Sequence, residues 1–271
     1  MKSKVFAIAL CVALPAGATP PTDPWALVPA LPSGCYEEQD GYLAKVDTAI
    51  AMFDQEIDAQ RAINDEIGGQ VASAASADPY AMMDRMQDYL MNNPEEATKM
   101  MEDLYATGQT IGDELVEDIE REQELTAPLD GLSARYRTAY AEHRAPIEAM
   151  VAALPTEEGE AGAYFTDEAI AQLPAINRQA NAAYERLCAQ WWQNGPFVAP
   201  LTEFRAFLAN DRAPRQDKVF AQGKQQWDIQ GIDTSEARSL AAMEAARDYL
   251  KQVQRVYGLR VQNRTDLHIR P

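Results

Sequence analysis

The stretch "YLAKVDTAIAMFDQEIDAQRAINDEI" (residues 42–67) decides the expected fold of this chain. Its apolar residues recur every three or four positions, as they do on one face of an amphipathic helix. Gln60 and Asn64 continue the same narrow stripe, which is typical of helices that pack on a partner helix. We expect this helix to end at Gly68-Gly69, because glycine readily adopts the left-handed conformation of a helix cap. The apolar members of the stripe are Leu43, Val46, Ile50, Phe53, Ile57 and Ile67.

Helical patterns recur along most of the remaining sequence. Asp78-Pro79 and Asn93-Pro94 predict two helix starts, since proline at the first helical position loses no hydrogen bond. Pro128 predicts a kink or a new helix near Thr126. Further helices are expected over residues 129–154, 170–191 and 233–258.

These patterns predict an all-α protein whose long antiparallel helices form an elongated, coiled-coil-like bundle. Residues 1–18 are interpreted as a signal peptide and residues 19–36 as a proline-rich extended lead-in. Residues 37–258 form the expected helical domain, with a possible subdivision near 155–166. The ending, residues 259–271, alternates apolar and polar positions, which predicts a short extended tail.

The N-terminus indicates export. Lys2 and Lys4 precede the apolar run "VFAIALCVAL" (residues 5–14), and "AGA" (residues 16–18) supplies small residues at the cleavage position. The run is shorter than the roughly 20 apolar residues that span a bilayer. We therefore expect a periplasmic or secreted protein that starts at Thr19 and has no stable membrane insertion after cleavage.

Export would change both the number of cysteines and their redox environment. Without Cys11 the mature chain keeps Cys35 and Cys188, and two cysteines in an oxidising compartment predict a disulfide. Closing a loop of about 150 residues in this way contributes roughly 4–5 kcal/mol in the chain-entropy model. The alternative is a pair of buried free thiols.

The charge of the chain is strongly negative and uneven. The 24 basic and 42 acidic residues give a net charge of −18, which disfavours nucleic acid and anionic lipid as partners. Between Glu37 and Leu125 there are 23 acidic and five basic residues, whereas residues 212–271 hold 11 basic and seven acidic ones. This asymmetry predicts that the basic C-terminal helix pairs with the acidic N-terminal helices, within one chain or between chains. In the acidic run 113–122, Leu115 and Ile119 are expected on the buried side and the carboxylates elsewhere.

Residues for catalysis are few. Histidine occurs only at His143 and His268, and the sequence contains no zinc-protease, serine-hydrolase, phosphate-loop or EF-hand motif. We assign no catalytic residue, no metal ligand set and no cofactor. A pair of carboxylates acting as in a glycosidase remains an alternative, because acidic residues are abundant.

Six of the ten methionines fall within residues 82–101. They have three interpretations: packing in the core, a pliable surface that binds another protein, or a thioether site for Cu(I). Met101 shares a helical face with Leu104 and Ile111, which favours core packing for that residue. The candidate residues for a protein-binding surface are Met82, Met83, Met86 and Met91, together with Trp191 and Trp192.

The segment "MNNPEEATKMM" (residues 91–101) resembles the Asn-Pro-Glu helices with flanking methionines found in the helical modules of ubiquilins and related co-chaperones. That resemblance implies a methionine-lined groove that grips apolar segments. The favoured interpretation is an exported, acidic, non-catalytic helical interaction protein, such as a scaffold, adaptor or chaperone-like protein, with a protein partner or self-association. The alternatives are a methionine-rich Cu(I)-handling protein and a carboxylate-dependent hydrolase.

Overall fold

The computed structural model describes residues 23–32, 39–159, 162–193 and 195–267. Seven α-helices and one two-stranded hairpin make up these residues, which confirms the all-α class. The predicted signal peptide and Cys35 lie outside the described residues. The elements are η1 (Pro24–Leu27), α1 (Gln39–Ala77), α2 (Pro79–Asn92), α3 (Pro94–Ala152), β1 (Thr156–Gly159), β2 (Gly162–Phe165), α4 (Asp167–Cys188), the π-helical turn η2 (Ala189–Gln193), α5 (Val198–Phe207), the π-helical turn η3 (Leu208–Arg212), α6 (Ala213–Ile229) and α7 (Ala241–Leu267).

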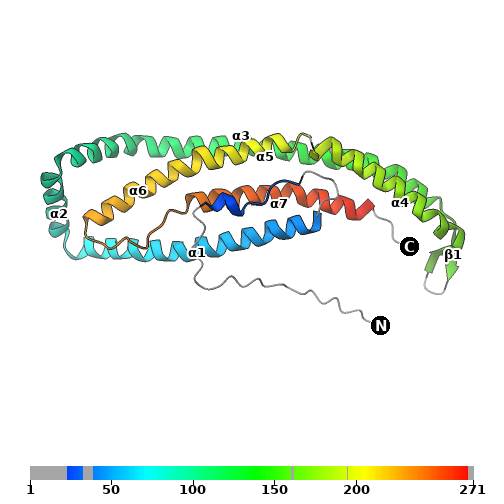
Figure 1. The fold of residues 1–271 in the computed structure, drawn as a ribbon, viewed down its shortest axis with the longest axis horizontal. Coiled ribbons are helices and arrows are strands. Elements are labelled where there is room, and N and C mark those ends of the chain that lie inside the picture. The colour runs from blue at the N-terminus through cyan, green and yellow to red at the C-terminus, as the bar shows by residue number, and fades with distance from the viewer. Residues whose placement is uncertain (1–22, 33–38, 160–161, 194, 268–271) are drawn as a thin grey trace.

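The helices form an elongated molecule (Figure 1). Helices α1 and α3 run along opposite long sides, and α2 crosses between them at one end. At 1.5 Å per residue, the 59 residues of α3 extend about 90 Å. Helices α4, α5 and α6 return along α3, and α7 then runs antiparallel to α1 in the middle of the molecule. Helix α2 therefore lies at one end of the molecule, and the β1–β2 hairpin lies at the other end.

The predicted stripe of α1 is confirmed. Its apolar members include Val46, Phe53 and Ile57, which are buried in the main core. The two polar members bind the loop before α7: Gln60 donates to the carbonyl of Glu236 at 2.8 Å, and Asn64 donates to the carbonyl of Arg238 at 2.9 Å. The main core joins this stripe to α3, α5 and α7 through buried residues such as Leu129, Tyr136, Phe204, Leu250 and Val253.

A second, smaller core lies in the arm formed by the end of α3 and the start of α4. Its members are separate from the main core, and the β1–β2 hairpin connects the two helices. Residues 155–166, where a subdivision of the helical domain was expected, therefore contain the turn between two helices of one arm. The buried members are Ile147, Leu154, Ala169, Leu173, Ile176 and Ala180.

Trp191 and Trp192 belong to the core, so their assignment to a protein-binding surface was wrong. Their exposed fractions are only 7% and 1%. The ring of Trp192 stacks on that of Phe197 with centroids 4.3 Å apart, and Tyr136 meets both tryptophans edge to face. Aromatic pairs of this geometry add to the stabilisation from burial alone. Both indoles belong to the π-helical turn η2, which continues directly from α4.

Two helix ends differ from the sequence-based expectation. Helix α1 continues through Gly68-Gly69 to Ala77, because a helical glycine costs only about 1 kcal/mol relative to alanine and both sites are sterically open. Helix α7 begins at Ala241 rather than Asp233 and passes Gly258 to reach Leu267. The extended tail expected from residue 259 was therefore wrong over residues 259–267. The helix continues there because Tyr257 and Arg260 are both buried on its inner face.

Helix α3 also continues where a new start or kink was predicted. Pro128 lies inside it, between the buried residues Leu125 and Leu129. A proline in a helix interior removes one backbone hydrogen bond. The buried apolar residues on either side of it keep the same face toward the core, so packing holds the helix together here.

The predicted pairing of the basic C-terminal helix with acidic N-terminal helices is confirmed within one chain. Arg247 of α7 lies 3.5 Å from Asp54 of α1, and Arg255 lies 2.6 Å from Asp130 of α3. The first pair accompanies apolar burial along the α1–α7 contact, and the second joins α7 to α3.

Candidate functional site

Helix α2 is a separate element with well-defined ends. Asp78 caps its start, since its carboxylate accepts a hydrogen bond from the backbone N–H of Ala81 at 2.9 Å and Pro79 follows at the first helical position. At its end, the backbone and side-chain N–H groups of Asn93 both donate to the carbonyl of Tyr89. Both predicted helix starts, at Asp78-Pro79 and Asn93-Pro94, are confirmed.

One face of α2 attaches it to the rest of the molecule. Arg85 donates to the carbonyl of Gln230 at 2.7 Å, which ties α2 to the end of α6. Tyr89 donates to the carboxylate of Glu96 at the start of α3, at 2.8 Å. Met86 and Leu90, on the same side of the helix as Tyr89, are partly buried. Helix α2 therefore has a fixed orientation across the end of the molecule.

A second face of α2 carries three large apolar side chains that are exposed to solvent. Tyr80, Met83 and Met91 are 80%, 68% and 63% exposed. At 100° per residue, the three positions fall within an arc of about 80° around the helix. We call Tyr80, Met83 and Met91 the α2 outer face. Exposed apolar side chains gathered on one face are typical of an interaction site, whereas single ones are ordinary.

The structure thus separates the predicted methionines. Met83 and Met91 are exposed, and Met86 is partly buried. The side chains of Met82 and Met101 are outside the part of the chain whose side chains are described. Tyr80 was missed by the sequence reasoning, although its position three residues before Met83 places it on the same helical face.

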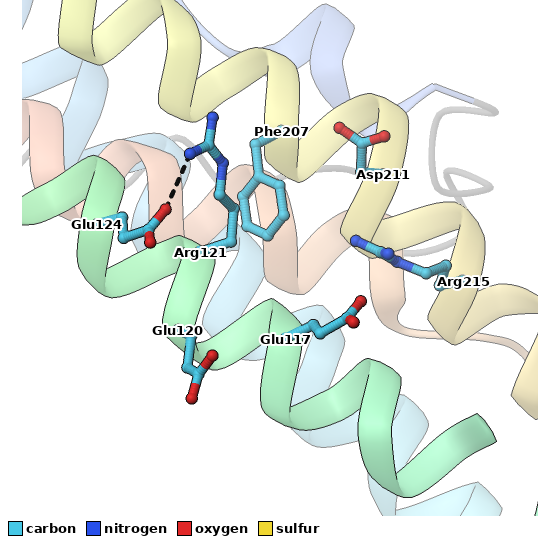
Figure 2. A pocket seen from close by; sticks show the side chains of 7 residues that line it. All are labelled: Glu117, Glu120, Arg121, Glu124, Phe207, Asp211 and Arg215. Carbon is cyan, nitrogen blue, oxygen red and sulfur yellow. Dashed lines mark hydrogen bonds and ion pairs between the residues drawn. The ribbon is translucent and has the colours of Figure 1, made fainter. Parts of the chain in front are cut away.

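A second candidate is a groove between α3 and the α5–η3–α6 segment (Figure 2). Its volume is about 360 Å³, and Phe207 is its one apolar lining residue. Figure 2 shows Arg121 and Glu124 paired on one side and Arg215 projecting from α6 on the other. The lining residues are Glu117, Glu120, Arg121, Glu124, Phe207, Asp211 and Arg215.

The acidic run beside this groove has a different orientation from the predicted one. Asp118 is only 5% exposed and pairs with Arg215 of α6, whereas Ile119 is 56% exposed. The expectation that Ile119 lies on the buried side was wrong. The reason is an arginine on a helix nearly 100 positions later in the sequence, which compensates the burial of a carboxylate.

The groove is a place where charges of opposite sign meet. Arg121 lies 2.9 Å from Glu124, and Asp118 contacts Arg215. Glycosidase chemistry needs one carboxyl group kept protonated, usually by an apolar setting, opposite a second ionised one. At this groove the carboxylates of Glu124 and Asp118 instead lie beside guanidinium groups. Among the residues that the structure describes, no group of three or more His, Cys, Asp or Glu side chains converges as metal ligands would.

Two further residues considered in the sequence analysis, His143 and Cys188, lie within helices and pack against the rest of the protein. His143 is partly buried, and its Nδ1 lies 2.8 Å from the carbonyl of Ala139 one helical turn earlier. Cys188 is buried at the end of α4. Because Cys35 lies outside the described residues, the Cys35–Cys188 pairing stays a prediction.

Within the described residues, no helix is both long enough and apolar enough to cross a membrane. No protein-family model, curated protein or solved structure matches this chain.

Proposed function

We propose that this chain is an exported, acidic, non-catalytic helical interaction protein that uses the α2 outer face to bind a protein. The observation that carries the proposal is the outward position of Tyr80, Met83 and Met91 on a helix whose other face is already attached to α6 and α3. A scaffold, an adaptor or a chaperone-like protein is the matching class. The bound protein is either a partner or a second copy of the chain.

The residue types on this face support binding to other proteins. Methionine has three rotatable bonds and a polarizable thioether, so that it adapts to differently shaped apolar surfaces. Tyrosine is enriched in protein interfaces because it combines an apolar ring with a polar hydroxyl. Together the three side chains offer an adaptable apolar strip without a deep pocket.

The position of α2 supports the same proposal. The main core joins α1, α3, α5 and α7 and includes none of the described α2 side chains, and the α2 outer face is exposed. Tyr80, Met83 and Met91 therefore have little role in folding. Large apolar side chains in water lower solubility, so their presence on an exposed helix favours a role in binding.

Export is part of the proposal and rests on the sequence. Lys2 and Lys4, the apolar run and the small residues at 16–18 favour cleavage before Thr19. The predicted disulfide between Cys35 and Cys188 fits an oxidising compartment. Mass spectrometry of the mature protein is expected to give an N-terminus at or close to Thr19, and an intact Met1 in the purified protein would contradict export by this route.

Site-specific photo-crosslinking tests the binding function. A photoreactive phenylalanine at position 83 is expected to give a covalent protein adduct in living cells, because that position lies at the centre of the proposed surface. The matched control is position 168, where Glu168 is also exposed but lies at the start of α4 in the distant arm. Equal adduct formation at both positions, or none at position 83, would contradict the proposed function.

A further inference from the structure

Two unpaired carboxylates border the α2 outer face. Asp84 and Asp88 are exposed and four residues apart, so they form a row along the helix. Relative to Tyr80 they lie about 40° and 80° around the helix, beside Met91. Neither has an ion-pair partner among the residues that the structure describes. The α2 outer face is therefore an apolar strip with an acidic row along one edge.

The neighbouring cation does not neutralise this row. Arg85 lies about 140° from Tyr80 around the helix and donates its hydrogen bond to the carbonyl of Gln230. Its guanidinium is thus committed to the attached side of α2. Arg85 is therefore not paired with Asp84 or Asp88.

The same charges oppose a second copy of this chain as the occupant. Residues 78–102 contain six acidic and two basic residues, a net charge of −4. A two-fold dimer places the same acidic patch on both sides of the interface. Like charges facing each other across an interface are unfavourable and suppress that pairing.

We infer that the partner of the α2 outer face is a basic amphipathic helix, with apolar residues along one face and Lys or Arg residues four positions apart beside them. The apolar strip of the partner covers Tyr80, Met83 and Met91, and its basic row meets Asp84 and Asp88. In this mode of recognition an amphipathic helix packs its apolar face on an apolar surface. The charged pairs fix how the two helices are aligned along their length. The inference rests on the proposed binding function and adds the chemistry of the partner.

A designed peptide is the probe. It has 14 residues, the length of α2, with leucines on one helical face and lysines four apart beside them. Fluorescence anisotropy with the purified full chain is expected to show binding at least about ten-fold tighter than for a peptide of the same composition in scrambled order. The scrambled peptide has the same charge, so equal binding of both peptides would show attraction to the acidic chain as a whole and overturn the inference.

Variants of the protein locate the binding. The triple change Tyr80→Ser, Met83→Ser, Met91→Ser is expected to weaken peptide binding about ten-fold or more. The double change Asp84→Asn, Asp88→Asn is expected to weaken it about three- to ten-fold and to reduce its salt dependence. The matched control for charge is Glu157→Gln, Glu158→Gln on the exposed hairpin, which removes two charges elsewhere and leaves binding unchanged. Equal effects of the two charge-removing variants overturn the inference.

Sedimentation velocity separates this inference from the proposed function. The full chain is expected to be monomeric at low salt. A dimer that the Met83→Ser change abolishes would show that a second copy is the occupant, which overturns the inference and leaves the binding function standing. A second result would also overturn the inference and leave the binding function standing. It is the formation of specific adducts at position 83 when the ordered basic peptide binds no more tightly than the scrambled one.

Discussion

Arg212 of η3 lies 2.9 Å from the carboxylate of Asp248 in α7, and its second terminal nitrogen lies 2.9 Å from Glu122 in α3. Asp248 in turn lies 3.1 Å from Arg247, which reaches Asp54 of α1 at 3.5 Å. This row of alternating charges joins α3, η3, α7 and α1, four segments that are far apart in the sequence. Arg212 is its most buried member, with 14% of its side chain exposed.

The change Arg212→Met is expected to lower the free energy of unfolding by about 1–3 kcal/mol. It leaves the partly buried carboxylates of Glu122 and Asp248 without their shared cation, and removing one partner of a buried pair costs more than the pair itself contributes. Urea denaturation measures the loss. The matched control is Arg121→Met, whose pair with Glu124 is largely exposed and is worth less than about 1 kcal/mol. Equal losses in both variants would contradict the role given to Arg212.

Gly195 is expected to tolerate no side chain. A Cβ atom at this position would overlap the backbone carbonyl group of Trp191. The change Gly195→Ala therefore forces the turn after η2 to move and should cost about 1–3 kcal/mol, seen as a lower midpoint in a thermal melt. Gly131 in α3 is the control, because its Cβ would meet open space. There, alanine should raise stability by about 0.5–1 kcal/mol, and the two glycines responding alike would contradict this account.

Alkaline pH is expected to unfold the protein through its buried tyrosines. Burial raises the pKa of both Tyr249 and Tyr257 to about 12, from an ordinary value of 10.0. A raised pKa means that the folded protein keeps two protons that the unfolded chain loses. The corresponding stability is complete below pH 10 and disappears as the pH rises through 12, by roughly 2–3 kcal/mol per tyrosine at most.

Urea midpoints measured across this pH range check the effect. The change Tyr249→Phe removes one of the titrating groups and should make the fall in stability less steep between pH 10 and 12. A variant with the same pH dependence as the unchanged protein would show that Tyr249 is not a source of the alkaline unfolding.

The predicted disulfide has a direct chemical test. Non-reducing mass spectrometry of the exported protein is expected to recover a peptide that links Cys35 to Cys188. Reduction should lower stability by roughly 4–5 kcal/mol if the closed loop of about 150 residues acts through chain entropy alone. Recovery of free Cys35 from the exported protein would show that this prediction is wrong.

Regular features of the fold could be predicted from the sequence because they depend on local pattern. The stripe of α1 and the proline-initiated starts of α2 and α3 follow from side-chain periodicity and backbone chemistry. The end of α1 could not be predicted. Gly68-Gly69 favours a stop in isolation, but the local cost of two glycines is small beside the packing of a 39-residue helix.

The burial of side chains that contact residues far away in the sequence could not be predicted from local sequence periodicity. Asp118 is buried because Arg215 meets it from another helix, and the resulting register exposes Ile119. Trp192 is buried because the η2 turn stacks it on Phe197. For the candidate site, the sequence predicted Met83 and Met91 but included both tryptophans in error. It omitted Tyr80, whose exposure follows from the side of α2 that Arg85 attaches.

The central claim is that the α2 outer face has little role in folding and is available for binding. Chemical denaturation of Met83→Ser and Met91→Ser, each alone, tests it most directly. Both changes are expected to leave the free energy of unfolding within about 0.5 kcal/mol of the unchanged protein, as at ordinary surface positions. Leu250→Ala in the main core is the reference, with an expected loss of about 2–5 kcal/mol. Losses of about 2 kcal/mol or more at both methionines would place them in the core and contradict the account.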